Sequence, residues 1–94
     1  MILINKCLKE FTTPEYKVSY DELHDILRVF SDPFADFSFE TFDDFVEIAV
    51  DERSSLVVGV QISGFVNNID VITDEFTDCY PAFSDVISRT RSMI

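Results

Sequence analysis

Few residues in this 94-residue chain carry side chains that commonly take part in catalysis. His24 is the only histidine, and the two cysteines, Cys7 and Cys79, are far apart in the sequence. A histidine that acts as a general base needs a nucleophile or an acid partner, and no serine, cysteine or carboxylate is specially placed for His24. We therefore expect His24 to be a solvated turn residue. We expect both cysteines to be reduced thiols, and a disulfide that joins the chain ends is the alternative.

Carboxylates are more numerous, and Asp43, Asp44, Glu47 and Asp51 fall within one short stretch. They could suggest a metal site, but no histidine or cysteine accompanies them, and they lack the glycine and the ligand spacing of a calcium loop. The chain has only two glycines, so it has no phosphate-binding loop. We expect no metal, no cofactor and no catalytic residue, and we expect that the protein is not an enzyme.

Charge is the strongest feature of the composition. Eighteen acidic and seven basic residues give a net charge of −11 and an isoelectric point near 4.1. Arg53 is the only basic residue between Val29 and Ser88, a segment that holds thirteen acidic residues. Such a surface repels nucleic acid and anionic membranes and attracts basic proteins. We therefore expect a basic protein partner, with neither nucleic acid nor a membrane as a direct ligand. The alternative is that the charge serves solubility alone.

The segment FADFSFETFDDF, residues 34–45, combines five phenylalanines with several acids. Aromatic side chains supply contact area at interfaces, and acids supply charge complementarity to a basic partner. The alternative is that these rings cap the core beneath a long loop. We predict a partner-binding surface that also includes two acids of the next strand. Its residues are Asp36, Phe37, Glu40, Asp43, Asp44, Glu47 and Asp51.

Two strands must position the centre of this surface. Apolar and polar residues alternate in FVEIAVDE, residues 45–52, and in LVVGVQISG, residues 56–64. A period of two with one apolar face predicts two antiparallel strands joined by the loop ERSS. Gly59, inside the second strand, indicates a bulge or the close approach of another group. The predicted buried face consists of Val46, Ile48, Val50, Leu56, Val58, Val60 and Ile62.

Helical spacing is present toward both ends of the chain. Residues 2–11 place several apolar side chains near one helical face, which predicts a short N-terminal helix that ends before Pro14. After Gly64, apolar residues recur every three or four positions as far as Ile87. Proline cannot donate a backbone hydrogen bond within a helix, so the pattern predicts two helices, or one kinked helix, with Pro81 at the start of the second.

The segment VSYDELHDILRVF, residues 18–30, is compatible with two structures. Ser19 and Glu22 have the spacing of a helix capping box, whereas residues 17–20 and 26–30 are two short β-rich runs. Three pieces, YDELHDILRVF, ETFDDFVEIAVDE and LVVGVQI, together resemble a family of small bacterial and phage domains of unknown function, numbered 2283. The resemblance covers residues 17–63 and implies that the first piece is a β-hairpin. Some members are encoded beside small RNase-like toxins, which implies an antitoxin-like or immunity role.

These patterns together predict one α+β domain over residues 1–94. Two hairpins form an antiparallel sheet of three or four strands, and N- and C-terminal helices cover one face. The predicted function is that of a non-catalytic acidic binding protein, which neutralises a nuclease toxin or a host nucleic-acid enzyme as an immunity protein, antitoxin or DNA-mimic inhibitor. The alternative is a structural module that forms a homo-oligomer, such as a homodimer. No apolar run of membrane length and no signal-peptide pattern is present, so we expect a cytoplasmic location.

Overall fold

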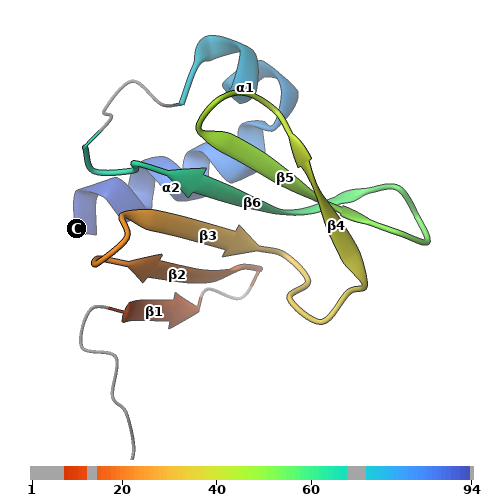
Figure 1. Ribbon diagram of the computed structural model, residues 1–94, viewed down its shortest axis with the longest axis horizontal. Helices are drawn as coiled ribbons and strands as arrows, with labels where there is room; N and C mark the ends of the chain where they lie inside the picture. Colours follow the sequence, from red (N-terminus) through yellow and green to blue (C-terminus); the bar gives the residue numbers. More distant parts are fainter. Residues whose placement is uncertain (1–7, 13–14, 68–71, 94) are drawn as a thin grey trace, which may run out of the picture.

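The computed structural model describes residues 8–12, 15–67 and 72–93, which form one antiparallel sheet with two helices (Figure 1). The strands are β1 (Leu8–Thr12), β2 (Lys17–Asp21), β3 (Ile26–Phe30), β4 (Phe37–Thr41), β5 (Val46–Asp51) and β6 (Val57–Ser63). They lie in the order β1-β2-β3-β6-β5-β4. The helices are α1 (Asp74–Cys79) and α2 (Pro81–Met93). The predicted α+β class with an antiparallel sheet is therefore confirmed.

The sheet has six strands instead of the predicted three or four, because a strand is added at each edge. Residues 8–12, which we predicted to be helical, form β1 and pair with β2 from Leu8–Asp21 to Thr12–Lys17. A free strand edge can override a local helical spacing as weak as this one, because strand formation depends strongly on tertiary context. The rest of the predicted N-terminal helix, residues 2–7, lies outside the described residues. The second added strand, β4, arises within the phenylalanine-rich connection.

Residues 17–30 form a hairpin of β2 and β3, so the hairpin prediction is confirmed and the capping-box alternative is wrong. The pairs Val18–Val29 and Tyr20–Leu27 stand side by side on one face of this hairpin. All four side chains are at most 3% exposed. Cross-strand apolar pairs of this kind are the main stabilising unit of a sheet, and they outweigh the small contribution of a helix cap.

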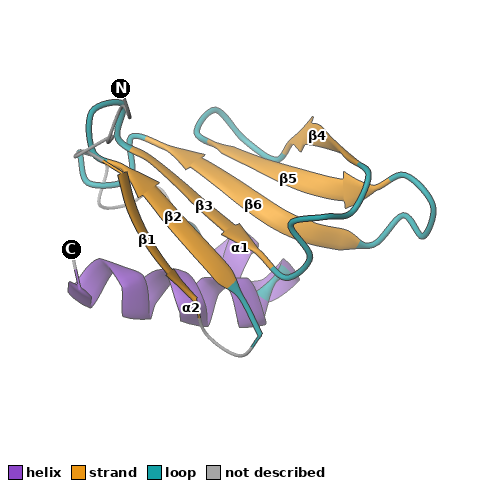
Figure 2. Cartoon of the chain, turned by 90° about the horizontal axis from the view of Figure 1, so that it is seen from below, coloured by secondary structure: helices purple, strands orange, loops and turns teal. Residues whose placement is uncertain are grey.

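Both helices lie on the same face of the sheet, and Figure 2 shows the opposite face uncovered. Thr73 caps the start of α1 by accepting a hydrogen bond from the backbone N–H of Phe76, and α2 begins at Pro81 as predicted. The core between the layers joins strand residues such as Leu27, Val60 and Ile62 to Phe76, Phe83 and Ile87 of the helices. None of the described helices has the length and apolarity that a membrane crossing requires.

The predicted buried face is only partly correct. Val46, Val58, Val60 and Ile62 are buried, whereas Ile48 and Val50 are half-buried and Leu56 is 66% exposed. The β5–β6 hairpin extends beyond the end of the helical layer in Figure 1, so its outer residues have no cover. A bulge between β5 and β6 near Ala49 and Val50 also shifts the pairing. Val58 consequently packs in a second small cluster with Phe30 and Ala49 rather than in the main core.

A buried carboxylate joins the β2–β3 turn to the segment that follows β6. Asp25 has a positive φ of 54°, which aspartate tolerates better than most residues. Its side chain accepts hydrogen bonds from the Tyr20 hydroxyl at 2.7 Å, the Val66 N–H at 2.8 Å, and the backbone and side-chain nitrogens of Asn67 at 3.0 and 2.8 Å. Burial alone would raise the pKa of Asp25, but these hydrogen bonds together lower it. Burial and the bond to Asp25 raise the pKa of Tyr20 to about 12.

Candidate partner-binding face

The sheet face opposite the helices, which we call the open face, carries two neighbouring rows of side chains. Each row crosses the strands in the order β2, β3, β6, β5 and β4. The strand registers give the first row as Lys17, Phe30, Gly59, Ala49 and Phe39, and the second as Ser19, Arg28, Gln61, Glu47 and Thr41. The first row is mainly apolar and the second is polar, so the open face has two chemically different bands.

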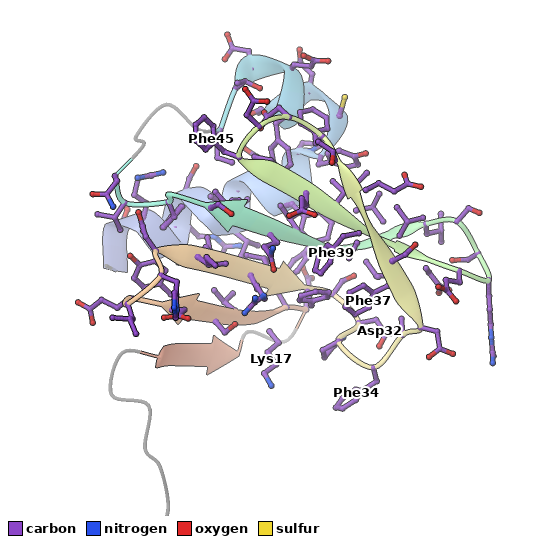
Figure 3. The ribbon with its side chains drawn as sticks, viewed as in Figure 1. Lys17, Asp32, Phe34, Phe37, Phe39 and Phe45 are labelled. Carbon is purple, nitrogen blue, oxygen red and sulfur yellow. The ribbon has the colours of Figure 1, made fainter. Side chains whose placement is uncertain are left out.

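An aromatic cluster of Phe30, Phe37 and Phe39 lies at the β4 side of the open face (Figure 3). The Phe37 ring is 5.1 Å from that of Phe30 and 5.2 Å from that of Phe39, measured between ring centroids. The ring of Phe30 occupies the space above Gly59, where a Cβ atom would overlap it. The close approach that Gly59 indicated in the sequence is therefore that of Phe30.

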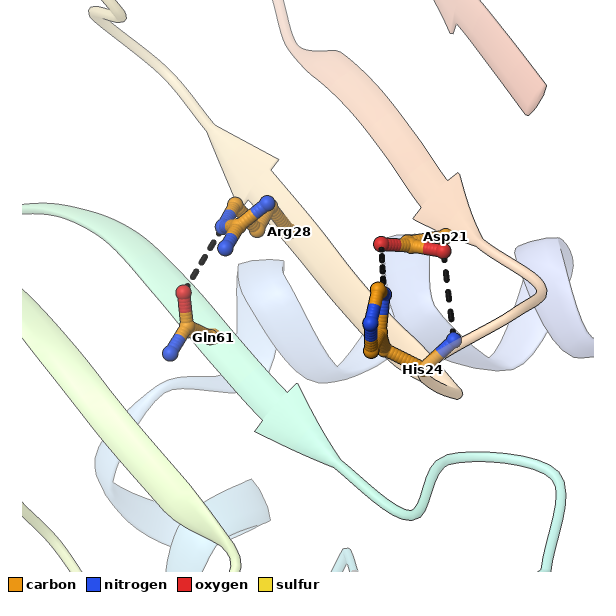
Figure 4. A network of polar contacts seen from close by, with 4 residues as sticks. All are labelled: Asp21, His24, Arg28 and Gln61. Atoms are coloured by element: carbon orange, nitrogen blue, oxygen red, sulfur yellow. Dashed lines mark hydrogen bonds and ion pairs between the residues drawn. The ribbon is translucent and has the colours of Figure 1, made fainter. Parts of the chain in front are cut away.

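The polar row is connected by side-chain hydrogen bonds. Arg28 Nε donates to Gln61 Oε1 at 2.7 Å (Figure 4), and Gln61 Nε2 donates to Glu47 Oε1 at 3.4 Å. Gln61 thus lies between the positive charge of Arg28 and the negative charge of Glu47. Because Glu47 is half-buried and engaged in this chain of contacts, it is less available to a partner than we predicted.

The phenylalanines of the connection differ in exposure from our prediction. Phe37, the one phenylalanine in the predicted partner-binding surface, is half-buried within the aromatic cluster. Phe34 is 93% exposed, Phe45 is 44% exposed and Phe39 is 39% exposed. Figure 3 shows Phe34 pointing away from the protein, beyond the end of the aromatic cluster. The alternative that these rings only cap the core fits Phe42, whose ring lies 5.5 Å from that of Phe76.

Two of the predicted carboxylates hold turns by accepting backbone hydrogen bonds. The Asp43 carboxylate accepts hydrogen bonds from the N–H groups of Phe45 at 2.9 Å and Val46 at 3.0 Å, and so holds the β4–β5 turn. Asp51 accepts from the Arg53 N–H at 2.8 Å, and this bond lowers the pKa of Asp51. Neither carboxylate can turn toward a partner without giving up these contacts.

Among the predicted site residues, the acids with free side chains are Asp36, Glu40 and Asp44. All three are exposed, and they form no side-chain hydrogen bond or ion pair with the described residues. Asp36 directly precedes β4, Glu40 lies within it, and Asp44 follows it in the turn. Glu40 pairs with Ile48, so it lies on the helix side of β4, opposite to Phe37 and Phe39. The free carboxylates therefore flank β4 along its length, and they do not form one patch on the open face.

The remaining candidates for chemistry occupy surface positions. His24 is exposed in the β2–β3 turn, as predicted, where its Nδ1 lies 2.7 Å from the Asp21 carboxylate (Figure 4). This contact lowers the pKa of Asp21. Cys79 is an exposed free thiol, and Cys7 lies outside the described residues. Within the described ranges, no three histidine, cysteine or acidic side chains gather as a metal site would require.

Our prediction from the sequence left out three phenylalanines of this face and its border: Phe30, Phe34 and Phe39. The position of Phe30 depends on the pairing of β3 with β6, segments about thirty residues apart in the sequence. The available clue was Gly59 within a strand rich in β-branched residues. The exposure of Phe34 follows from the turn before β4, where its N–H bonds to the Asp32 carboxylate at 3.1 Å. Asp32 followed by Pro33 was the local indication of that turn.

The contact between Phe30 and Gly59 leads to a prediction about stability. The Gly59→Ala substitution should reduce the free energy of unfolding by about 1 to 3 kcal/mol, because the Phe30 ring must leave its position over β6. Urea denaturation of the two proteins would measure this. The matched control is Gly59→Ala combined with Phe30→Leu, in which the smaller side chain should remove much of the penalty of adding the methyl group. An unchanged stability of the single variant would contradict the packing described here.

Comparison of the chain with protein-family models, with curated proteins and with solved structures finds no match.

Proposed function

We propose that the protein is a non-catalytic binding protein that neutralises a basic protein partner, such as a nuclease toxin or an enzyme that acts on nucleic acid. The observation that carries the proposal is the combination of exposed aromatic side chains with acids that form no ion pair with the described residues. Residues 32–52 contain eight acids and no basic residue, and β4 with its flanking turns belongs to this segment. A basic partner would gain both contact area and charge complementarity there.

The proposed interface differs from the sequence-based one in its residues. Its aromatic part is Phe34 and Phe39, which are exposed, with Phe37 as their support in the aromatic cluster. Its acidic part is Asp36, Glu40 and Asp44, while Asp43, Glu47 and Asp51 hold the surrounding structure. The acids would occupy basic side chains of the partner, which could then no longer bind the phosphates of a nucleic acid. An acidic protein can block a nucleic-acid enzyme in this way.

The proposal is tested by reversing charges that the fold does not use. Asp36→Lys combined with Asp44→Lys should weaken binding of the partner by about tenfold for each charge that faces a partner base. Affinity capture would identify the partner, and calorimetry at several salt concentrations would then measure the dissociation constant. The affinity of the unchanged protein should fall as salt increases, because exposed charge pairs are screened.

The matched control carries the same change of net charge on the helices. Asp78→Lys combined with Asp85→Lys alters two exposed residues of α1 and α2, the helices that cover the other face of the sheet. Asp85 forms an ion pair with Arg89 at 3.0 Å, but both side chains are exposed, so its loss should affect stability little. This variant should bind the partner with nearly unchanged affinity. If both double variants weaken binding equally, the effect is one of total charge and the proposed location of the interface is wrong. If neither variant changes affinity or its salt dependence, the acids serve solubility and the proposed function is wrong.

The second candidate function is a structural module that associates with further copies of itself. It is favoured by the exposure of Phe34, since a large aromatic ring in water is a common feature of an unoccupied interface. Sedimentation equilibrium separates the two functions. A homo-oligomer held by phenylalanines should persist in high salt and dissociate in the Phe34→Ser variant.

A further inference from the structure

The strand β4 forms one edge of the described sheet, with β5 on one side and no strand on the other (Figure 1). Its side chains are exposed except for Phe37, which is half-buried. Natural edge strands are commonly protected by lysine, by proline or by a bulge, because an open edge can pair with another chain. β4 contains no lysine or proline, and its register with β5 is regular from Phe37–Asp51 to Thr41–Glu47. This edge is therefore available for pairing.

The hydrogen bonds at the two ends of β4 show which backbone groups face outward. The Phe42 N–H bonds to the Val46 carbonyl at 2.9 Å, and the Glu52 N–H bonds to the Asp36 carbonyl at 2.9 Å. In an antiparallel pair, bonded and non-bonded residues alternate. The even-numbered residues therefore bond to β5, and Phe37, Phe39 and Thr41 direct their N–H and carbonyl groups to the open edge. No hydrogen bond to these outward groups is present within the described parts of the chain.

We infer that the partner adds an extended strand to the free edge of β4 and that this strand alternates apolar and basic side chains. This inference rests on the proposed function and specifies how the partner would bind. Strand addition gives affinity through backbone bonds and specificity through alternate side chains. Partner residues opposite Phe37 and Phe39 lie on the open face beside the aromatic cluster, so they are apolar. A partner residue opposite Glu40 lies on the other face, so it is lysine or arginine.

Charge decides between a basic strand and a second copy of this chain. Pairing of β4 with itself would bring together two segments that each hold eight acids and no base. Like charges close together disfavour such a pairing, whereas lysine and arginine opposite these acids favour it. The free carboxylates of Asp36 and Asp44 lie before and after β4. They therefore favour basic side chains at both ends of an added strand as well.

The test uses a nine-residue peptide of alternating valine and lysine as the probe. Its backbone edge can be blocked by methylating the valine nitrogens, which face β4 when the peptide lies antiparallel to β4 with valine opposite Phe37 and Phe39. Methylation of the lysine nitrogens, which then face away, is the matched control with the same charge. The unmodified peptide and the lysine-methylated peptide should bind at least about tenfold more tightly than the valine-methylated one, because several hydrogen bonds are at stake.

Hydrogen exchange of individual amides gives an independent readout on the unmodified protein. Without the peptide, the outward N–H groups of Phe37, Phe39 and Thr41 should exchange much faster than those of Ser38 and Glu40. With the peptide bound, the outward groups should become protected by about tenfold or more. Thr41→Pro removes one outward donor and no bond to β5, so it should weaken binding several-fold. Thr41→Val keeps the donor and should bind as the original protein does.

The outcomes separate this inference from the proposed function. Equal binding of the differently methylated peptides, with a strong salt dependence, would overturn strand addition and leave an acidic binding surface. Protection of the outward amides without peptide, together with a dimer in sedimentation, would overturn it in favour of a second copy. Absence of peptide binding at low salt would also overturn it, whereas the proposed function is judged by the charge-reversed variants and the natural partner.

Discussion

Replacing Asp25 by alanine should lower the free energy of unfolding by about 3 kcal/mol. The carboxylate is 8% exposed and accepts hydrogen bonds from Tyr20, Val66 and Asn67, and all of these donors would lose their partner. Water can replace the carboxylate as the acceptor for the nitrogens of Val66 and Asn67, because both residues are exposed. It can do so much less readily for the hydroxyl of Tyr20, which is 3% exposed. Urea denaturation followed by circular dichroism would measure the loss. A change below about 1 kcal/mol would show that Asp25 does not hold the two turns together.

Two milder variants separate the contributions to this network. Tyr20→Phe removes one donor and leaves the Asp25 carboxylate with its nitrogen donors, so it should cost only about 1 kcal/mol. Asp25→Asn keeps the size of the side chain and its tolerance of a positive φ, but it lacks the negative charge. Its stability should fall between those of the alanine variant and the original protein.

The same network predicts a dependence of stability on pH. The pKa of Asp25 is lower in the folded protein than the ordinary value of 3.8. The unfolded protein therefore binds a proton more readily, so the stabilisation by Asp25 is complete above about pH 4 and is lost as the pH falls through the folded pKa. Because Asp21 and Asp51 also have lowered pKa values, the comparison must be with Asp25→Asn. The difference in stability between the two proteins should shrink below about pH 4.

The second large effect concerns the core, where Val60→Asp should unfold the protein. Val60 is completely buried, and an unpaired charge there costs more than the margin of roughly 5 to 15 kcal/mol that a domain of this kind possesses. Its cross-strand neighbour Ile48 is half-buried on the same face. Ile48→Asp is therefore the matched control, and it should leave a folded protein of reduced stability. Circular dichroism would show loss of the sheet signal in the first variant and its retention in the second.

A folded Val60→Asp protein would mean that the helices do not cover β6 as described. Unfolding of both variants would mean that the helices bury the apolar face of β5 as completely as that of β6. That was our prediction from the alternation pattern, in which Ile48 and Val60 were equivalent. The structure distinguishes them because Val60 lies on β6, near the middle of the sheet, and is completely buried, whereas Ile48 lies one strand nearer the β4 edge and is half-buried.

Local sequence patterns were enough to predict several elements. The alternation in residues 45–52 and 56–64 predicted β5 and β6, since a strand with one buried face must alternate. Pro81 marked the start of α2, because proline fits the first turn of a helix and no later one. The segment of residues 32–52 with eight acids and no base is likewise a property of the sequence alone. These features depend on residues close together in the chain.

Features that depend on distant segments were decided only by the tertiary structure. The conversion of residues 8–12 from a helical pattern into β1 required the free edge of β2. The aromatic cluster required β3, β6, β5 and β4 to lie side by side, so that Phe30 covers Gly59 and reaches Phe37. The burial of Asp25 required the segment after β6 to return to the β2–β3 turn. The alternation of a strand can be read from its own residues. The identity of the neighbouring strand cannot, because pairing depends on backbone and side chains that are distant in the sequence.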